Sequence, residues 1–186
     1  MKIRSILASL LLLATAPLFA QEGQAMPKPG AEHQLLAAKA GVWDATLEMT
    51  GSPTKSTGVS TVTVACGGFW VVDDFHADMG GMPFHGHGAT GYDPAKGKYV
   101  GSWIDSMTPS LMTLEGSMDK AGKVLTMSGM APGMDGKPVM HRMVTTQVDA
   151  NTQTFEMFVP GPDGKDMKVM TITYKKRAEK SGEKAK

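Results

Sequence analysis

The middle of the sequence is a succession of short segments in which apolar and polar residues alternate. In residues 42–50 every second side chain, from Trp43 to Met49, is apolar or small, and the side chains between them are polar. Side chains of a β-strand point to opposite faces in turn, so this period of two predicts a strand with one buried face. A chain built from many such segments is restricted to an all-β fold.

About ten segments of this kind follow one another at intervals of roughly 8–14 residues. They are separated by short stretches rich in Asp, Asn, Gly and Pro, which reverse the chain because Gly accepts positive φ and Asp or Asn binds nearby backbone. The predicted strands are residues 42–50, 58–66, 68–78, 84–92, 98–105, 110–118, 123–130, 138–148, 153–159 and 167–174.

These connections are too short for the crossovers that parallel strands need, so neighbouring strands are expected to be antiparallel. A long meander must protect its edge strands, and closure into a barrel does so most completely. The sequence therefore predicts an up-and-down β-barrel, with a two-sheet sandwich as the alternative. One short helix is expected over residues 31–41, before the first strand, because Leu35 and Leu36 give it an apolar side and Gly41 can end it.

The first twenty residues predict export. Lys2 and Arg4 precede an apolar run from Ile6 to Ala16, which has the length of a signal-peptide core and is too short to span a bilayer as a helix. Cleavage is expected near Ala20, which would place the protein in the periplasm or outside the cell. Cys66 is the only cysteine, so no intramolecular disulfide is expected there, and we expect its side chain to be buried.

The chain after the predicted signal peptide is expected to consist of a leader, one domain and a tail. Residues 21–30 are expected to be a flexible leader, residues 31–175 a single barrel domain and residues 176–186 a disordered basic tail. The formal net charge of the whole chain is +1. This balance argues against a nucleic-acid partner, because such proteins carry a basic surface.

Two resemblances follow from particular residues. The order of a helix, then Gly41-Val42-Trp43, then an antiparallel meander resembles the calycin barrels. In lipocalins, a Gly-x-Trp on the first strand places its Trp at the closed end, where a basic residue of the last strand stacks on it. The resemblance implies that a residue between Lys175 and Arg177 occupies that place.

The second resemblance extends over residues 31–175. The series Gly-Tyr-Asp-Pro (91–94), Trp-Ile-Asp-Ser-Met (103–107) and Leu-Glu-Gly (114–116) is similar to the bacterial family catalogued as domain of unknown function 1579. Members of that family are often exported, and the resemblance implies a calycin-like barrel. It brings no activity and no catalytic residues to this chain.

A barrel of this strand number can hold one small ligand. We therefore expect a lumen that binds a small, largely apolar molecule. The chain has 16 methionines, whose flexible thioether side chains suit an adaptable pocket. The side chains expected to line the pocket are Trp43, Trp70, Trp103 and Met107, with Asp105 as a polar anchor.

A metal site is the alternative function. His85 and His87 are two residues apart and so share one face of a strand, with His76 on the strand before and Met79 and Met82 in the connecting loop. Imidazole and thioether ligands together suit copper, which an exported protein would meet. These five residues are the candidate ligands.

A catalytic function has less support in the sequence. The motifs of serine hydrolases, zinc proteases, phosphate-binding loops and dinucleotide-binding folds are absent, which favours binding over catalysis. The remaining possibility is a hydrolase in which Asp105 and Glu115, on neighbouring predicted strands, form a pair of carboxylates.

Overall fold

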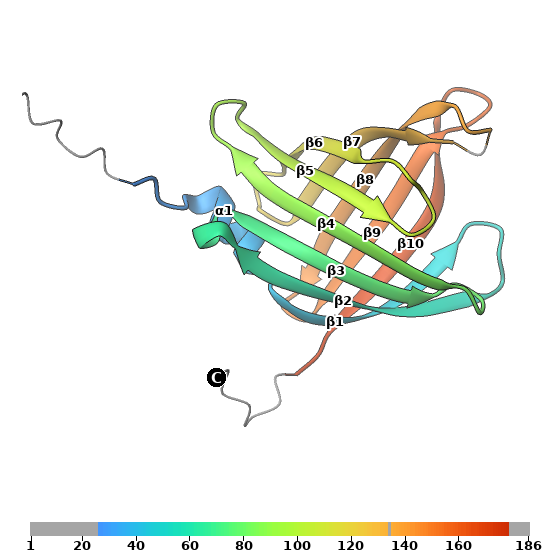
Figure 1. Ribbon diagram of the computed structural model, residues 1–186, viewed down its shortest axis with the longest axis horizontal. Helices are drawn as coiled ribbons and strands as arrows, with labels where there is room; N and C mark the ends of the chain where they lie inside the picture. Colours follow the sequence, from blue (N-terminus) through green and yellow to red (C-terminus); the bar gives the residue numbers. More distant parts are fainter. Residues whose placement is uncertain (1–25, 134, 179–186) are drawn as a thin grey trace, which may run out of the picture.

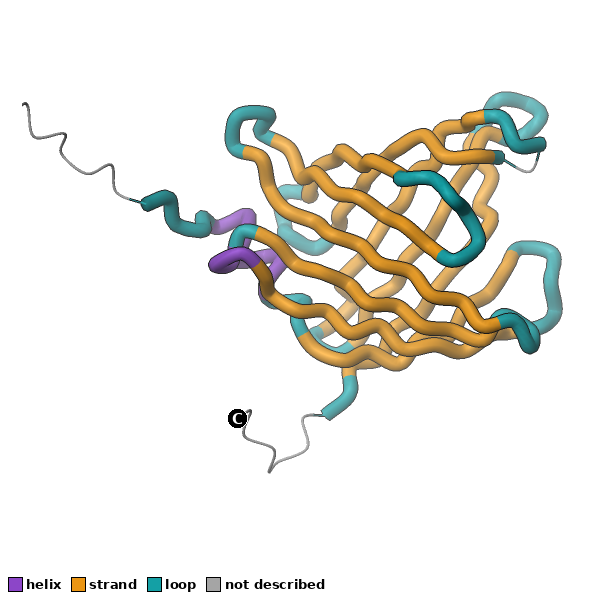
Figure 2. Tube along the Cα trace, in the orientation of Figure 1, coloured by secondary structure: helices purple, strands orange, loops and turns teal. Residues whose placement is uncertain are grey.

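The computed structural model describes residues 26–133 and 135–178. Within them the chain forms one short helix, one 3₁₀ turn and ten strands (Figures 1 and 2). The elements are α1 (Ala31–Ala37), β1 (Gly41–Met49), β2 (Lys55–Ala65), η1 (Cys66–Gly68), β3 (Trp70–Asp78), β4 (Pro83–Asp93), β5 (Lys98–Asp105), β6 (Met112–Met118), β7 (Val124–Pro132), β8 (Pro138–Asp149), β9 (Thr152–Pro160) and β10 (Asp166–Lys176).

The strands form a closed antiparallel barrel, which confirms the predicted fold. Each strand pairs with its neighbour in sequence, and β1 closes the barrel by pairing with both β2 and β10. Trp43, for example, lies opposite Ser60 on one side and Lys176 on the other. Closure leaves no strand edge unpaired, which removes the aggregation hazard of a long meander.

Helix α1 covers one end of the barrel. It packs beside the connection between β2 and β3 and beside β3 and β4 (Figure 1). Leu36 points into the barrel and is almost fully buried, while the ring of His33 meets the edge of Phe69 and of Tyr92. The helix is shorter than predicted and ends at Ala37, but it occupies the expected place before β1.

The opposite end of the barrel carries the other five connections. The β1–β2, β3–β4, β5–β6, β7–β8 and β9–β10 loops all lie there, away from α1 (Figures 1 and 2). No helix within residues 26–133 and 135–178 is long and apolar enough to cross a membrane. Inward-facing rows of apolar side chains from all ten strands make the core, which surrounds the lumen.

Two sequence-based expectations need correction near the closed end. Cys66 is exposed, because β2 ends at Ala65 and the chain turns at Cys66 with φ of 50°. Lys176 belongs to β10, and the backbone N–H of Arg177 donates to the carbonyl of Val42, so the barrel extends past residue 175. Residues 1–20, predicted as a signal peptide, lie outside the described residues, as do residues 21–25 of the predicted leader and 179–186 of the predicted tail.

Candidate ligand-binding cavity

The barrel encloses a cavity of about 700 Å³. Leu36 and Lys39 line it at the end covered by α1, and Met79, Met107 and Gly133 line it at the end where the loops gather. Met107 is 60% exposed, so this second end opens toward solvent. A volume of this size is in the range of sites that bury a whole small molecule, which is about 300–1,000 Å³.

The lining is dominated by flexible apolar side chains. Half of the 16 methionines face the cavity, together with aliphatic and aromatic residues from every part of the wall. Methionine adapts to irregular shapes because its side chain is unbranched and polarisable. The lining methionines are Met49, Met79, Met107, Met112, Met127, Met143, Met157 and Met170.

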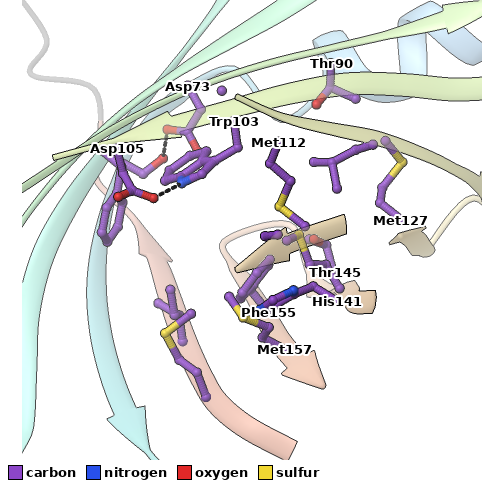
Figure 3. Close-up of a pocket in the computed structure, with 18 of the residues that line it drawn as sticks. Asp73, Thr90, Trp103, Asp105, Met112, Met127, His141, Thr145, Phe155 and Met157 are labelled. Atoms are coloured by element: carbon purple, nitrogen blue, oxygen red, sulfur yellow. Dashed lines mark hydrogen bonds between the residues drawn. The ribbon is translucent and has the colours of Figure 1, made fainter. Parts of the chain in front are cut away.

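Trp103 and Asp105 form a fixed unit on the inward row of β5. The indole Nε1 of Trp103 donates a 3.0 Å hydrogen bond to Oδ2 of Asp105 (Figure 3). The other carboxylate oxygen, Oδ1, accepts from the backbone N–H groups of Met107 and Thr108, both at 2.9 Å. Asp105 therefore holds the turn after β5 and fixes the indole at the same time.

Two glycines of β4 make room for this indole. A Cβ on Gly86 would overlap the six-membered ring of Trp103, and one on Gly88 would lie 3.0 Å from it. The ring thus lies flat across the inner face of β4. The alternation of His and Gly in residues 85–88 is explained by this packing, since only the glycines face inward.

A second carboxylate, Asp73 of β3, lies within the apolar lumen. The hydroxyl of Ser60 donates to its Oδ1 at 2.6 Å (Figure 3). Burial raises the pKa of Asp73, and the hydrogen bond from Ser60 opposes that rise. Burial, together with the nearby charge of Asp73, also raises the pKa of Tyr174, another lining residue. The side chains of Asp73 and Tyr174 are therefore biased toward their neutral, protonated forms.

The closed end carries two further polar groups. Burial lowers the pKa of Lys39 to about 8, and within the described part of the chain no carboxylate forms an ion pair with it. The side-chain oxygen Oε1 of Gln153 is buried, and no donor among the described residues reaches it. Both residues line the cavity, so the end farthest from the opening holds hydrogen-bonding groups that side chains of the described residues do not pair with.

Residues 28–176 match the family described as "Protein of unknown function (DUF1579)". The chain belongs to this family. The match extends from the segment before α1 to the end of β10, so the DUF1579 region is the barrel itself.

The chain also resembles solved structures that share little of its sequence. No curated protein matches the sequence. The solved structures that are similar to the chain include a redesigned β-barrel, mFAP1, bound to DFHBI, and another redesigned β-barrel, b11L5F_LGL. The first is 14% identical, with 79% of this chain and 100% of that chain covered and a TM-score of 0.42. The second is 12% identical, with 82% and 100% covered and a TM-score of 0.44.

Of the residues expected to line the pocket in this DUF1579 barrel, Trp103, Asp105 and Met107 do so. Trp43 and Trp70 do not. Trp43 is 1% exposed and packs beneath the closed end, where its Nε1 donates to the carbonyl of Lys39. The Nζ atom of Lys176 lies 5.3 Å from the centre of its ring, the arrangement that the Gly-x-Trp resemblance implied. Trp70 covers Gly91 of the neighbouring strand at the same end.

Asp105, expected from the sequence as the polar anchor of the pocket, is already engaged within the protein. Its two oxygens already accept three hydrogen bonds from Trp103, Met107 and Thr108. A ligand would have to compete with them. Asp73, which has only Ser60 as a hydrogen-bonding partner among the described residues, is better placed for that role.

The structure separates the five candidate copper ligands. Met79 lines the cavity, and Met82 is exposed in the β3–β4 loop. His76, His85 and His87 instead face outward from β3 and β4. In residues 26–133 and 135–178, no group of three or more His, Cys, Asp or Glu side chains stands ready to hold a metal ion.

The proposed pair of catalytic carboxylates is wrong. Glu115 faces outward from β6, where Lys96 and Lys98 form ion pairs with it, while Asp105 faces the lumen. The two carboxylates are on opposite sides of the barrel wall because residues 112 and 114 of β6 carry the buried side chains.

Several residues that line the cavity were not predicted from the sequence, although the alternation of inward and outward side chains identifies one of them. In residues 71–75 the inward row reads Val71, Asp73, Phe75, so alternation alone places one acid among buried side chains. Lys39 gave no such signal, since it follows the helix and belongs to no strand.

Proposed function

We propose that the protein is an exported binding protein that takes up a small, largely apolar molecule in the barrel lumen. The cavity of about 700 Å³, lined mainly by methionine, aliphatic and aromatic side chains, is the observation that carries the proposal. Enclosing an apolar ligand in such a space removes its surface from water, which contributes roughly 25 cal/mol for each Å² buried.

The polar groups of the lumen suggest how a ligand is oriented. The opening is lined by Met79 and Met107, and the acceptor and donor groups of Asp73, Lys39 and Gln153 lie deeper in the barrel. A ligand with one polar end would therefore enter with that end first. Its polar group would replace the missing partner of a buried side chain, which is worth more than a hydrogen bond at the surface.

Binding is favoured over catalysis by the way the lumenal acids are used. Asp105 is fully occupied in holding Trp103 and the β5–β6 turn, and the second acid of the hydrolase hypothesis lies outside the barrel. The lumenal His141 directs Nδ1 toward the carbonyl of Val139, 3.2 Å away on its own strand. None of these arrangements pairs a nucleophile with a base.

Export is part of the same proposal. It rests on the amino-terminal sequence, whose expected cleavage near Ala20 precedes the first residue of α1 by ten positions. Removal of that segment would leave the helix, the ten strands and the cavity intact. The exported protein would then meet apolar molecules in the periplasm or outside the cell.

Native mass spectrometry of the protein purified from its own host tests this proposal. We expect an organic molecule bound to each chain, released when the protein is denatured, and a polypeptide mass that corresponds to cleavage near Ala20. A bare polypeptide that also fails to take up apolar molecules in solution would contradict ligand binding, and an uncleaved amino terminus would contradict export.

A further inference from the structure

A group of imidazole and carboxylate side chains lies on the outer wall of the barrel. β3 and β4 pair so that His76 is directly opposite His85, and Asp74 is directly opposite His87. The four residues therefore form two adjacent cross-strand pairs on one face of a two-stranded ribbon, seen at the front of Figure 1. Gly86, between the two histidines of β4, and Gly88, after the second, face inward, so the wall separates this group from the cavity.

The side chains of this group are already close to one another. Nε2 of His76 lies 2.9 Å from Oδ1 of Asp74, and Nδ1 of His87 lies 3.5 Å from the same oxygen. The rings of His76 and His85 are 4.3 Å apart between centroids. In a tetrahedral site with bonds of about 2.0 Å, neighbouring ligand atoms are about 3.3 Å apart, which is close to the two distances between nitrogen and oxygen atoms.

We propose that Asp74, His76, His85 and His87 form a surface site for a divalent transition-metal ion, with Zn²⁺ as the ion that best fits three imidazoles and one carboxylate. As they stand, the described residues do not direct three such donors to one point. The imidazole rings must turn to close the site. They have room to do so, since the side chains of His76 and His87 are 50% and 56% exposed.

The donor set decides which ions fit. Imidazole and carboxylate suit Zn²⁺ and other divalent ions, whereas copper(I) prefers thioether and thiolate ligands. Met79 lines the cavity on the other side of the wall, so it is not among the donors. The site therefore keeps the three histidines of the copper site expected from the sequence, but it has the carboxylate of Asp74 in place of the two methionines.

The backbone gives the site a rigid base. Both pairs lie in the middle of a regular antiparallel ladder that runs without a bulge from Trp70 to Asp78. Sites built on strands hold their ligands more accurately than sites built on loops. Only side-chain rotation, and no change in the barrel, is required for binding.

Titration of the untagged, chelator-treated protein with Zn²⁺ tests the site, with Co²⁺ absorbance as a second readout of tetrahedral coordination. We expect one ion per chain. His76→Ala and His87→Ala should each weaken Zn²⁺ binding by at least about tenfold, because each removes a direct ligand. These half-exposed side chains carry no core packing, so circular dichroism should show that both variants fold.

His141→Ala is the matched control, because it removes a histidine from the lumen and should leave Zn²⁺ affinity unchanged. Met79→Leu combined with Met82→Leu should also leave it unchanged. Failure of the wild-type protein to bind Zn²⁺, or binding that survives loss of His76 and His87, would overturn the proposal. Since the cavity is on the other side of the wall, either result is independent of the lumenal function.

Discussion

The indole Nε1 of Trp103 and the carboxylate Oδ2 of Asp105 are joined by a 3.0 Å hydrogen bond across one inward-facing row of β5. This hydrogen bond joins the cavity wall, formed here by Trp103, to the turn after β5 at the opening. Asp105 also caps the turn that begins the β5–β6 loop, and the indole lies across two glycines of β4. The shape of the lumen near its opening therefore depends on a small set of polar and steric constraints.

Replacing Asp105 by Ala should destabilise the barrel. Three donors, namely the indole of Trp103 and the backbone N–H groups of Met107 and Thr108, lose their acceptor. We expect the free energy of unfolding to fall by about 2–3 kcal/mol in urea titrations. Asp163→Ala is the control, since that exposed carboxylate accepts one backbone hydrogen bond in the β9–β10 turn. Equal losses in the two variants would refute the role given to Asp105.

Gly86→Ala should displace the ring of Trp103. The added Cβ would overlap the indole, whose Nε1 is held by its hydrogen bond to Asp105. We expect a loss of about 1–3 kcal/mol in the free energy of unfolding. In a double-mutant cycle, the same change should cost less when Trp103 is already Phe, because the smaller ring leaves room. Additive effects would show that the two residues do not meet.

Asp73→Asn should change how stability depends on pH. Burial raises the pKa of Asp73 above its ordinary 3.8, so the folded protein binds this proton more tightly than the unfolded chain does. The free energy of unfolding of the wild type therefore falls as the pH rises from 3.8 to the raised pKa. Asn carries no titrating proton, so the variant should gain relative stability across that window and keep it at neutral pH. Denaturant unfolding at several pH values measures the difference in free energy of unfolding between the wild type and the variant. A difference that does not change with pH would contradict the raised pKa of Asp73.

Lys39→Met should stabilise the protein at neutral pH. Burial lowers the pKa of Lys39 to about 8 from its ordinary 10.5, so the folded state disfavours the charged amine. Stability should rise with pH between these two values in the wild type and not in the variant. We expect the variant to be about 1–3 kcal/mol more stable below pH 8, and this advantage to shrink as the pH rises from 8 to 10.5. The exposed Lys120→Met is the control and should show neither effect.

The barrel could be predicted from the sequence because its signal is local. Period-two alternation and turn residues identify each strand, and short connections permit antiparallel neighbours alone. The same alternation separates inward from outward side chains, so the outward position of Glu115 could have been read from the buried Met112 and Leu114. The ion pairs of Glu115 with Lys96 and Lys98 depend on the register of β5 against β6, which the sequence pattern does not give.

The contents of the lumen were harder to predict. Trp103 and Trp43 both face inward from their strands, but only the first reaches the cavity, because the second lies beneath the segment that follows α1. Which end a residue occupies depends on register and closure, and these are tertiary properties. His76, His85 and His87 lie on the same outer face of β3 and β4, as alternation alone predicts, whereas Met79 of the β3–β4 loop lines the cavity.

Uptake of a neutral apolar fluorophore, N-phenyl-1-naphthylamine, is the most direct test of the central claim that the lumen binds a small apolar molecule. The wild-type protein should bind one molecule with a blue shift in emission. Met112→Trp combined with Met127→Trp, which fills the cavity from two buried lining positions, should weaken binding at least about tenfold. Ile104→Trp adds similar bulk on the outer face and should bind as the wild type does. Equal binding by all three proteins, or no binding by the wild type, would contradict the account.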